Sequence, residues 1–399
     1  MMKPTAYHER YEQLDALRGF ALFGILLANL CSFVGLSTLM PHEIIVLPSA
    51  DRTVLFFIDW AVEGKFYSIF SMLFGMGFAL QWMRADDNQK VFAAFWFRRM
   101  RFLLCLGLLH MYLVWHGDIL TLYSLMGMLL IFFVNFSCRA LLLTSITLLI
   151  LPLIMHVVVT ITQDNVFWSI AYDAIMSWRN TLGYGDLSLL EMRTSDNPLE
   201  VYFINIFSAL GRPMSYLQTG RLPQVLGMFM LGFYFMKSWR LKHDQSNEMI
   251  QKWHIFLILG ALLSLGYAWT KLKSGTPYAL DGFGMVQAVI YHISAPCFAL
   301  GIAGAFMNFW KNEKIQKSLT LFVPLGRMAL SNYIIQNTLG MLIFFGYGLA
   351  LMRQIPFAYI PVFAICILFA QWLLSTFWLS RFKQGPLEYL WRKYSYRDF

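Results

Sequence analysis

A histidine and an aspartate stand where the sequence is otherwise strongly apolar, and together these residue types can do acid–base chemistry. His110 interrupts an apolar stretch that follows a cluster of arginines, and Asp118 follows the break at the end of that stretch. An imidazole titrates near neutral pH, so it can take a proton from a hydroxyl or an amine. We predict that His110 is a general base and that Asp118 orients it. The alternative is a buried structural histidine beside a helix-capping aspartate.

Asn29 is predicted to lie at the same depth of a bilayer as His110. Each residue stands about six positions before the far end of its apolar stretch, so the two side chains could meet. An amide in this position could donate a hydrogen bond to a developing oxyanion, and Asn332 is a second candidate for that role. The alternative for Asn29 is a hydrogen bond between two helices.

Two arginines are predicted to mark an anion site at the other face of the membrane. Arg18 lies one turn inside the first apolar stretch, and Arg327 is the first residue of the predicted span 327–351. Both could hold the phosphates of a bound nucleotide-bearing ligand, because guanidinium groups donate to anionic oxygen in a fixed fork. Asn332 and Gln336 share one helix face near Arg327 and are grouped with this site. Snorkelling to lipid head groups is the alternative for Arg18.

These side chains require helices that cross a membrane. Of the 399 residues, 58% are apolar and only 13% are charged, whereas a soluble domain carries about a quarter charged residues. Residues 1–399 are therefore predicted to form one all-α, polytopic membrane domain, a bundle of about ten transmembrane helices. The predicted spans are 16–35, 54–84, 99–116, 118–136, 140–162, 222–240, 253–270, 284–309, 327–351 and 358–380.

The distribution of Lys and Arg orients this bundle. With the N-terminus in the cytoplasm, 21 basic residues fall on the inner side and 8 on the outer side. Both termini are therefore predicted to be cytoplasmic. The same rule explains the net charge of +9, so nucleic acid is not expected as a partner. The five cysteines are isolated and no metal-binding motif stands out, so no metal is predicted either.

Residues 163–221 form the only long interruption between predicted spans. This outer segment carries several acidic residues among tryptophans and tyrosines, with amphipathic stretches typical of interfacial helices. It could be a lid or a docking surface for a polar acceptor. From composition alone, we favour a loop with interfacial aromatic anchors.

Several blocks along the chain resemble the YeiB family of bacterial membrane proteins. The resemblance runs from Leu14 to Arg392 and implies a multi-pass protein of the bacterial cytoplasmic (inner) membrane. It is carried by LDALRGFALFGILLAN, GKFYSIFSMLFGMGF, GLLHMYLVWHGDILTLYSLMG, GRMALSNYIIQ and GPLEYLWR.

The first span is more distantly similar to transmembrane acyltransferases such as heparan-α-glucosaminide N-acetyltransferase. In the acyltransferase-three enzymes a catalytic histidine follows a basic residue after ten positions; here Arg18 matches, but Asn29 stands at the histidine position, as in the heparan enzyme. In that enzyme a histidine follows the asparagine by eleven residues, whereas this chain has Met40 there and His42 two residues later. The sequence around His110 favours this residue as the general base, whereas the similarity to the heparan enzyme favours His42.

These expectations combine into one hypothesis with two rivals. The chain would move an acyl group from cytoplasmic acyl-CoA, with acetyl-CoA the favoured donor, to a hydroxyl or amine of a glycan or small molecule at the outer face. Buried polar groups would equally suit a transporter or channel for a small polar or anionic solute, and a lipid-binding scaffold is a third reading. Membrane lipids are partners in each case, and a homodimer is compatible with the sequence.

Overall fold

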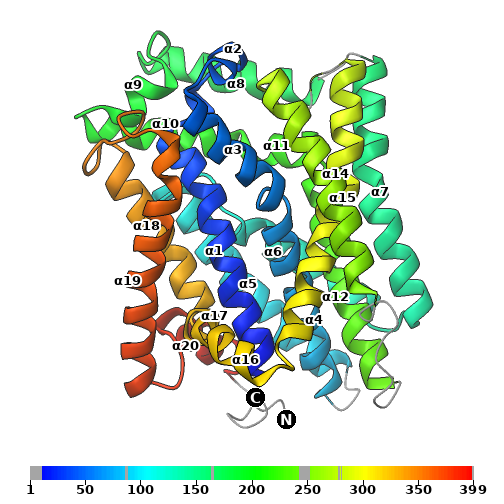
Figure 1. The fold of residues 1–399 in the computed structure, drawn as a ribbon. Helices are drawn as coiled ribbons and strands as arrows, with labels where there is room; N and C mark the ends of the chain where they lie inside the picture. Colours follow the sequence, from blue (N-terminus) through cyan, green and yellow to red (C-terminus); the bar gives the residue numbers. More distant parts are fainter. Residues whose placement is uncertain are drawn as a thin grey trace.

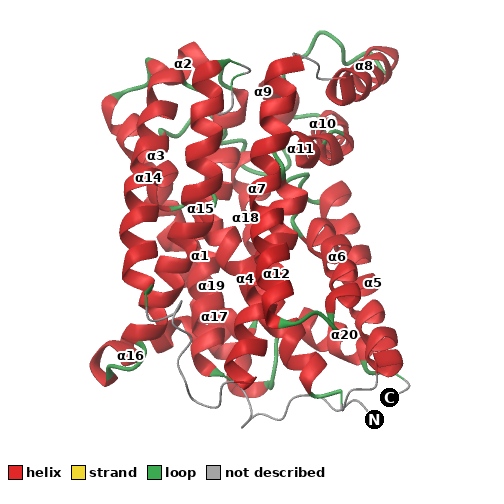
Figure 2. Ribbon diagram, turned by 90° about the vertical axis from the view of Figure 1, so that its right-hand side faces the viewer, coloured by secondary structure: helices red, strands yellow, loops and turns green. Residues whose placement is uncertain are grey.

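The computed structural model describes residues 11–85, 89–162, 166–241, 252–276, 279 and 281–397. Over these ranges the secondary structure is helical, without a strand (Figure 2). The long helices run side by side between two ends of the molecule (Figure 1). We call the end where α1 begins and α20 lies the lower end, and the opposite end the upper end. The outer segment begins at Gln163, and residues 163–165 lie outside the described ranges.

The helices are as follows. The first half contains α1 Glu12–Val34, α2 Pro41–Ile45, α3 Ser49–Ala61, α4 Lys65–Met83, α5 Gln89–Leu113, α6 Leu120–Leu129, η3 Leu130–Phe133 and α7 Cys138–Thr162. The outer segment contains α8 Val166–Thr181, α9 Leu189–Thr194, α10 Pro198–Leu210 and α11 Arg212–Gln218. The rest contains α12 Arg221–Leu241, α14 Trp253–Ser274, α15 Gly282–Phe309, α16 Glu313–Leu319, α17 Val323–Arg327, α18 Ala329–Phe344, α19 Ile360–Arg381 and α20 Pro386–Ser395.

Six helical stretches of the described chain are long and apolar enough to cross a membrane. They are Glu12–Thr38, Ser49–Met83, Cys138–Thr162, Trp253–Ser274, Gly282–Phe309 and Phe357–Arg381. The chain is therefore an all-helical membrane protein. The predicted count of about ten spans is not confirmed, because α6 has 10 residues and α18 has 16, shorter than the roughly 20 residues that a bilayer requires.

The predicted span 54–84 is divided into two helices. The chain breaks between α3 and α4 at Gly64, which has φ +85°. A side chain is excluded there, since a Cβ on Gly64 would lie 2.8 Å from the hydroxyl of Tyr291. Leu55 and Ile58 of α3 are buried, so the break lies within the bundle.

The outer segment is helical and covers the upper end of the bundle. Helices α8 and α10 lie across the direction of the long helices (Figures 1 and 2). The segment has a small apolar core of its own around Met192, Ile204 and Phe207. It is thus a folded cap made of helices, and the place of these helices at a membrane interface stays a prediction.

Glycines allow the long helices to approach closely. On α4, a Cβ at Gly75 would overlap the carbonyl oxygen of Phe229 on α12. On α12, a Cβ at Gly232 would overlap the carbonyl oxygen of Met72 on α4. Small residues at helix crossings are the usual device for packing backbones together in membranes, where hydrophobicity does not drive association.

Gly75→Ala should therefore separate α4 from α12 and lower stability by about 1–3 kcal/mol. The matched control is Gly266→Ala in α14, where a new Cβ meets nothing within 4 Å and the helix should gain about 0.5–1 kcal/mol. Thermal unfolding of both variants in detergent measures the difference. Equal midpoints for the two would contradict the packing described here.

Candidate functional site

His110 and Asp118 are hydrogen-bonded deep inside the bundle. His110 Nδ1 lies 2.9 Å from Asp118 Oδ1, and the two residues are 2% and 0% exposed. Asp118 reaches back because the chain turns sharply at Gly117, which packs on the indole of Trp115. Its second oxygen, Oδ2, accepts a hydrogen bond of 2.6 Å from the amide of Thr121 at the start of α6. The carboxylate therefore caps a helix and orients a histidine at once, so the two readings of Asp118 are not alternatives.

A chain of amides extends this pair to the first helix. Asn29 Nδ2 donates to Asn337 Oδ1 at 3.0 Å, and Asn337 Nδ2 lies 3.3 Å from His110 Nε2. Because the oxygen of Asn337 accepts from Asn29, its nitrogen is the group that donates to the imidazole. Nε2 is then an acceptor and Nδ1 carries the proton given to Asp118. Asn29 is thus linked to His110 through Asn337.

Tyr333 of α18 lies against the other side of His110. The two ring centroids are 5.4 Å apart. The tyrosine hydroxyl accepts from the amide of Ile119 at 3.2 Å and lies 3.5 Å from the carbonyl oxygen of Gly117. Tyr333 therefore braces the turn that carries Asp118.

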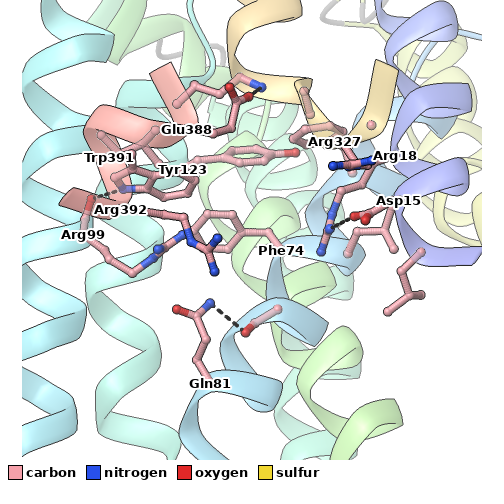
Figure 3. Close-up of a pocket in the computed structure, with 18 of the residues that line it drawn as sticks. Asp15, Arg18, Phe74, Gln81, Arg99, Tyr123, Arg327, Glu388, Trp391 and Arg392 are labelled. Atoms are coloured by element: carbon pink, nitrogen blue, oxygen red, sulfur yellow. Dashed lines mark hydrogen bonds and ion pairs between the residues drawn. The ribbon is translucent and has the colours of Figure 1, made fainter. Parts of the chain in front are cut away.

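A pocket of about 310 Å³ runs from the lower end of the bundle to this turn. Its deep wall includes Ile119, Leu120 and Tyr333. Five arginines line the rest: Arg18, Arg84, Arg99, Arg327 and Arg392. In Figure 3, Arg99 and Arg392 lie on one side of the pocket and Arg18 and Arg327 on the other. The pocket thus joins a basic mouth to Tyr333, which packs on His110. The predicted catalytic residues His110, Asp118 and Asn29 do not line it.

The two arginines predicted from sequence both line the pocket. Arg18 is bonded to Asp15 at 2.7 Å and its side chain is 28% exposed. Arg327 donates to the carbonyl oxygen of Lys383 at 3.0 Å. Sequence reasoning missed Arg99 as a pocket residue, although the cluster at the start of α5 was noted; its guanidinium stacks over Trp391, 3.8 Å from the ring centroid.

Asn332 and Gln336 are not among the residues that line this pocket. The amide of Asn332 donates to Leu325 O at 3.2 Å and to Ser375 Oγ at 2.9 Å, so it joins α18 to α17 and α19. Gln336 is fully buried, and its side chain has no hydrogen-bond partner among the described residues. The structure therefore does not bring Asn332 and Gln336 into the pocket with the arginines.

His42, the alternative base, lies elsewhere. It is exposed on α2 at the upper end (Figure 1) and takes no part in the hydrogen-bonded set around Asp118. Of the two candidates, His110 has the oriented imidazole that general-base chemistry requires.

The outer segment holds the turn between α5 and α6. Asn205 of α10 accepts from the amide of His116 at 2.7 Å and donates to the carbonyl oxygens of Met111 and Tyr112 at 3.1 Å each. Tyr216 of α11 donates to the carbonyl oxygen of Asp118 at 2.6 Å. The cap therefore lies directly on the backbone that presents Asp118.

At the lower end, α20 closes one side of the pocket. The carboxylate of Glu388 accepts from the amides of Leu330 and Ser331, at 2.7 and 3.0 Å, and from the Ser331 hydroxyl at 2.6 Å. It caps the start of α18. Burial nevertheless raises the pKa of Glu388 above its ordinary value, and the hydrogen bonds from Ser331 offset this only in part.

Comparison with known proteins finds a family model and several similar bacterial proteins. A family model described as "Protein of unknown function (DUF418)" matches residues 235–398. The uncharacterized protein YxaH of Bacillus subtilis (strain 168) is 29% identical over 414 residues, which cover 99% of this chain and 96% of that protein. The uncharacterized protein YeiB of Escherichia coli (strain K12) is 28% identical over 398 residues, covering 98% and 97%. The chain is thus similar over almost its whole length to YeiB and YxaH.

Nothing in the names of these proteins states an activity. An uncharacterized 39.9 kDa protein of Bacillus acidopullulyticus is also similar, at 28% identity over 99% of this chain and 96% of its own length. No solved structure matches the chain. The function therefore has to be argued from the site.

Glu388→Gln should stabilise the protein at neutral and alkaline pH. Because the pKa of Glu388 is raised in the folded protein, the folded chain binds this proton more tightly than the unfolded chain. The contribution of the bound proton to stability is fully present below the unfolded-state pKa of about 4.3. It is lost as the pH rises through the folded-state pKa. Glutamine imitates the protonated acid. The thermal midpoint of the variant should match the parent near about pH 4 and exceed it near about pH 8.

Glu191→Gln provides a control of opposite sign. Hydrogen bonds from Ser188 lower the pKa of Glu191, so this variant should lose stability relative to the parent as pH rises. A Glu388→Gln curve that runs parallel to the parent at every pH would show that the carboxyl does not titrate differently on folding.

Proposed function

We propose that this chain is a membrane acyltransferase that uses acyl-CoA, with acetyl-CoA as the favoured donor. The acyl group would pass to a hydroxyl or amine of a glycan or small molecule at the outer face. One observation carries the proposal: a single pocket has arginines at its mouth and ends at Ile119 and Tyr333, beside the hydrogen-bonded pair of His110 and Asp118. Neither His110 nor Asp118 lines the pocket itself.

The mouth of the pocket suits the nucleotide end of CoA. Guanidinium groups form bidentate, charge-assisted hydrogen bonds with phosphates. Arg18 and Arg327 would receive these phosphates from one side, and Arg99 and Arg392 from the other (Figure 3). The ring of Trp391, which also lines the pocket, offers a stacking surface for the base.

The proposal requires the lower end to face the cytoplasm, where acyl-CoA is found. The excess of 21 basic residues over 8 supports this orientation. The protein would then lie in the bacterial cytoplasmic membrane, with α20 on the inner side and α8 to α11 on the outer side.

The chemistry follows from the protonation state of the dyad. Nε2 of His110 is the free-base nitrogen, held only by a long hydrogen bond of 3.3 Å from Asn337. An acceptor hydroxyl or amine would displace this amide, give its proton to Nε2 and attack the thioester carbonyl carbon. The carbon–sulfur bond then breaks, and the imidazolium returns the proton to the CoA sulfur. Asp118 stabilises the imidazolium throughout.

The displaced amide has a second use. Once its nitrogen leaves Nε2, Asn337 remains bonded to Asn29 and can donate to the oxyanion of the tetrahedral intermediate. Tyr333 separates the deep end of the pocket from His110, so its ring must shift to admit the thioester. On the outer side, Asn205 and Tyr216 lie on the turn, so an acceptor would enter where α10 and α11 meet it.

Transport of a small solute is the second candidate, and the break between α3 and α4 favours it. Asp59 pairs with Lys271 at 2.5 Å, and Lys65 is fully buried with its ammonium on the carbonyl oxygen of Asp59. Charged groups at a discontinuous helix are typical of transporter binding sites. If the protein is a transporter, Lys65→Met should stop solute uptake into vesicles and His110→Ala should leave uptake intact. If it is only an acyltransferase, the parent protein itself should show no solute uptake.

A turnover assay tests the main proposal. The purified protein in vesicles receives acetyl-CoA on the arginine side and a panel of sugars and amino sugars on the other, and release of free CoA thiol is measured. His110→Ala should reduce the rate by about 10²–10⁴-fold, and adding Asp118→Ala should cost little more, because residues that act as a unit are non-additive. His254→Ala, an exposed histidine on α14, is the control and should retain full activity.

Donor binding is tested separately. Arg18→Lys keeps the charge but loses the planar fork, so CoA should bind roughly tenfold more weakly while expression stays normal. Arg101→Lys is the matched control, because Arg101 is exposed on α5 and does not line the pocket. Equal CoA affinity in the parent, Arg18→Lys and Arg101→Lys proteins would remove the phosphate role from Arg18.

A further inference from the structure

The final helix has two chemically different faces. Its inner face lines the pocket with Glu388, Trp391 and Arg392. Its outer face exposes Tyr389, Leu390 and Tyr394, which are 51%, 49% and 41% exposed. Large apolar side chains on both helix turns are thus left uncovered by the described chain.

Exposed basic residues accompany this uncovered apolar face in the sequence. Between residues 381 and 397 the exposed charged side chains are Arg381, Lys383, Lys393 and Arg397. The single acid in this range is Glu388, and its carboxylate is held at the start of α18. Between residues 381 and 397 the outward surface therefore combines aromatic and aliphatic groups with positive charge and carries no compensating carboxylate.

The position of α20 determines what can cover this face. It packs against α5 and the start of α18, beside the end of the membrane-spanning α19, and Figure 2 shows it alongside the lower part of α5. Its outer face is thus at the height where the hydrocarbon of the bilayer meets the head groups. Apolar rings enter that boundary while lysines and arginines reach the phosphates of anionic lipids.

We propose that α20 is an anionic-lipid-binding cover of the basic pocket. One face binds the head groups of the adjoining leaflet, and the other closes the pocket through the Glu388 cap and the stacking of Trp391 on Arg99. Anionic lipid therefore holds α20 in the docked position. The lipid contact stands by itself; its consequence, that negative lipid slows the entry and release of CoA together, rests on the proposed donor site.

Hydrogen exchange measures the lipid contact without any assay of activity. The full chain is placed in nanodiscs of phosphatidylcholine, with or without phosphatidylglycerol, at one ionic strength. Backbone amides of α20 should exchange roughly tenfold more slowly when phosphatidylglycerol is present, and added salt should remove most of that protection.

Paired lysine variants show whether the effect belongs to this surface. Lys383→Gln with Lys393→Gln should abolish the dependence on phosphatidylglycerol. The control, Lys314→Gln with Lys317→Gln, removes the same charge from the exposed face of α16 at the same end of the molecule. This control should keep the dependence of α20 exchange on phosphatidylglycerol. Equal protection in both lipids, or equal loss in both variants, would overturn the proposal.

CoA kinetics form the second arm. Association and dissociation of CoA should both slow in discs with phosphatidylglycerol, and Lys383→Gln with Lys393→Gln should restore the faster rates. If CoA fails to bind in either lipid while α20 is still protected by phosphatidylglycerol, the donor site is wrong and the lipid contact stands. If CoA binds and dissociates at the same rates with and without phosphatidylglycerol, α20 does not cover the pocket.

Discussion

The carboxylate of Asp118 is the interaction on which the site depends. It has no exposed surface, so each oxygen must be paired inside the protein. One oxygen accepts the hydrogen bond from Nδ1 of His110, and the other accepts the amide of Thr121 in the first turn of α6. These bonds fix the tautomer of the imidazole, the start of the next helix and the sharp turn between them. A change at any of the three would disturb the other two.

The same requirement explains the neighbours of this pair. An imidazole with one nitrogen on Asp118 has a second nitrogen that also needs a partner when no water is near. Asn337 supplies it, and Asn29 then satisfies the oxygen of Asn337. The result is a continuous line of hydrogen bonds through α1, α18, α5 and α6, helices brought together from distant parts of the chain. Catalysis requires that the weakest member of this line, the 3.3 Å contact, gives way to a substrate, and that the ring of Tyr333 shifts.

Sequence alone predicted the residues of the dyad but only part of their surroundings. His110 and Asp118 stood out because polar groups in apolar stretches are rare, and a break marked the turn between them. Asn337 was missed because the same span also offers Asn332 and Gln336, and only packing decides which face of a helix meets which neighbour. The break at Gly64 was visible as a run of polar residues, but its depth in the bundle depends on Tyr291 of a distant helix. The arginines of the pocket are brought together from α1, α4, α5, α17 and α20 by tertiary structure alone.

The distance between the two ends of the pocket restricts the chemistry of the donor. Arg18 and Asn29 lie on the same helix, and eleven residues of α-helix rise about 16 Å. A donor whose phosphates rest at Arg18 must therefore carry its reactive carbonyl on a long, thin arm to reach the level of His110. A small acyl phosphate has its carbonyl next to the phosphate, so it could satisfy the arginines or the histidine but not both. A thioester on the pantetheine arm of CoA separates the two groups, and this separation, more than the positive charge of the mouth, distinguishes CoA from other phosphorylated ligands.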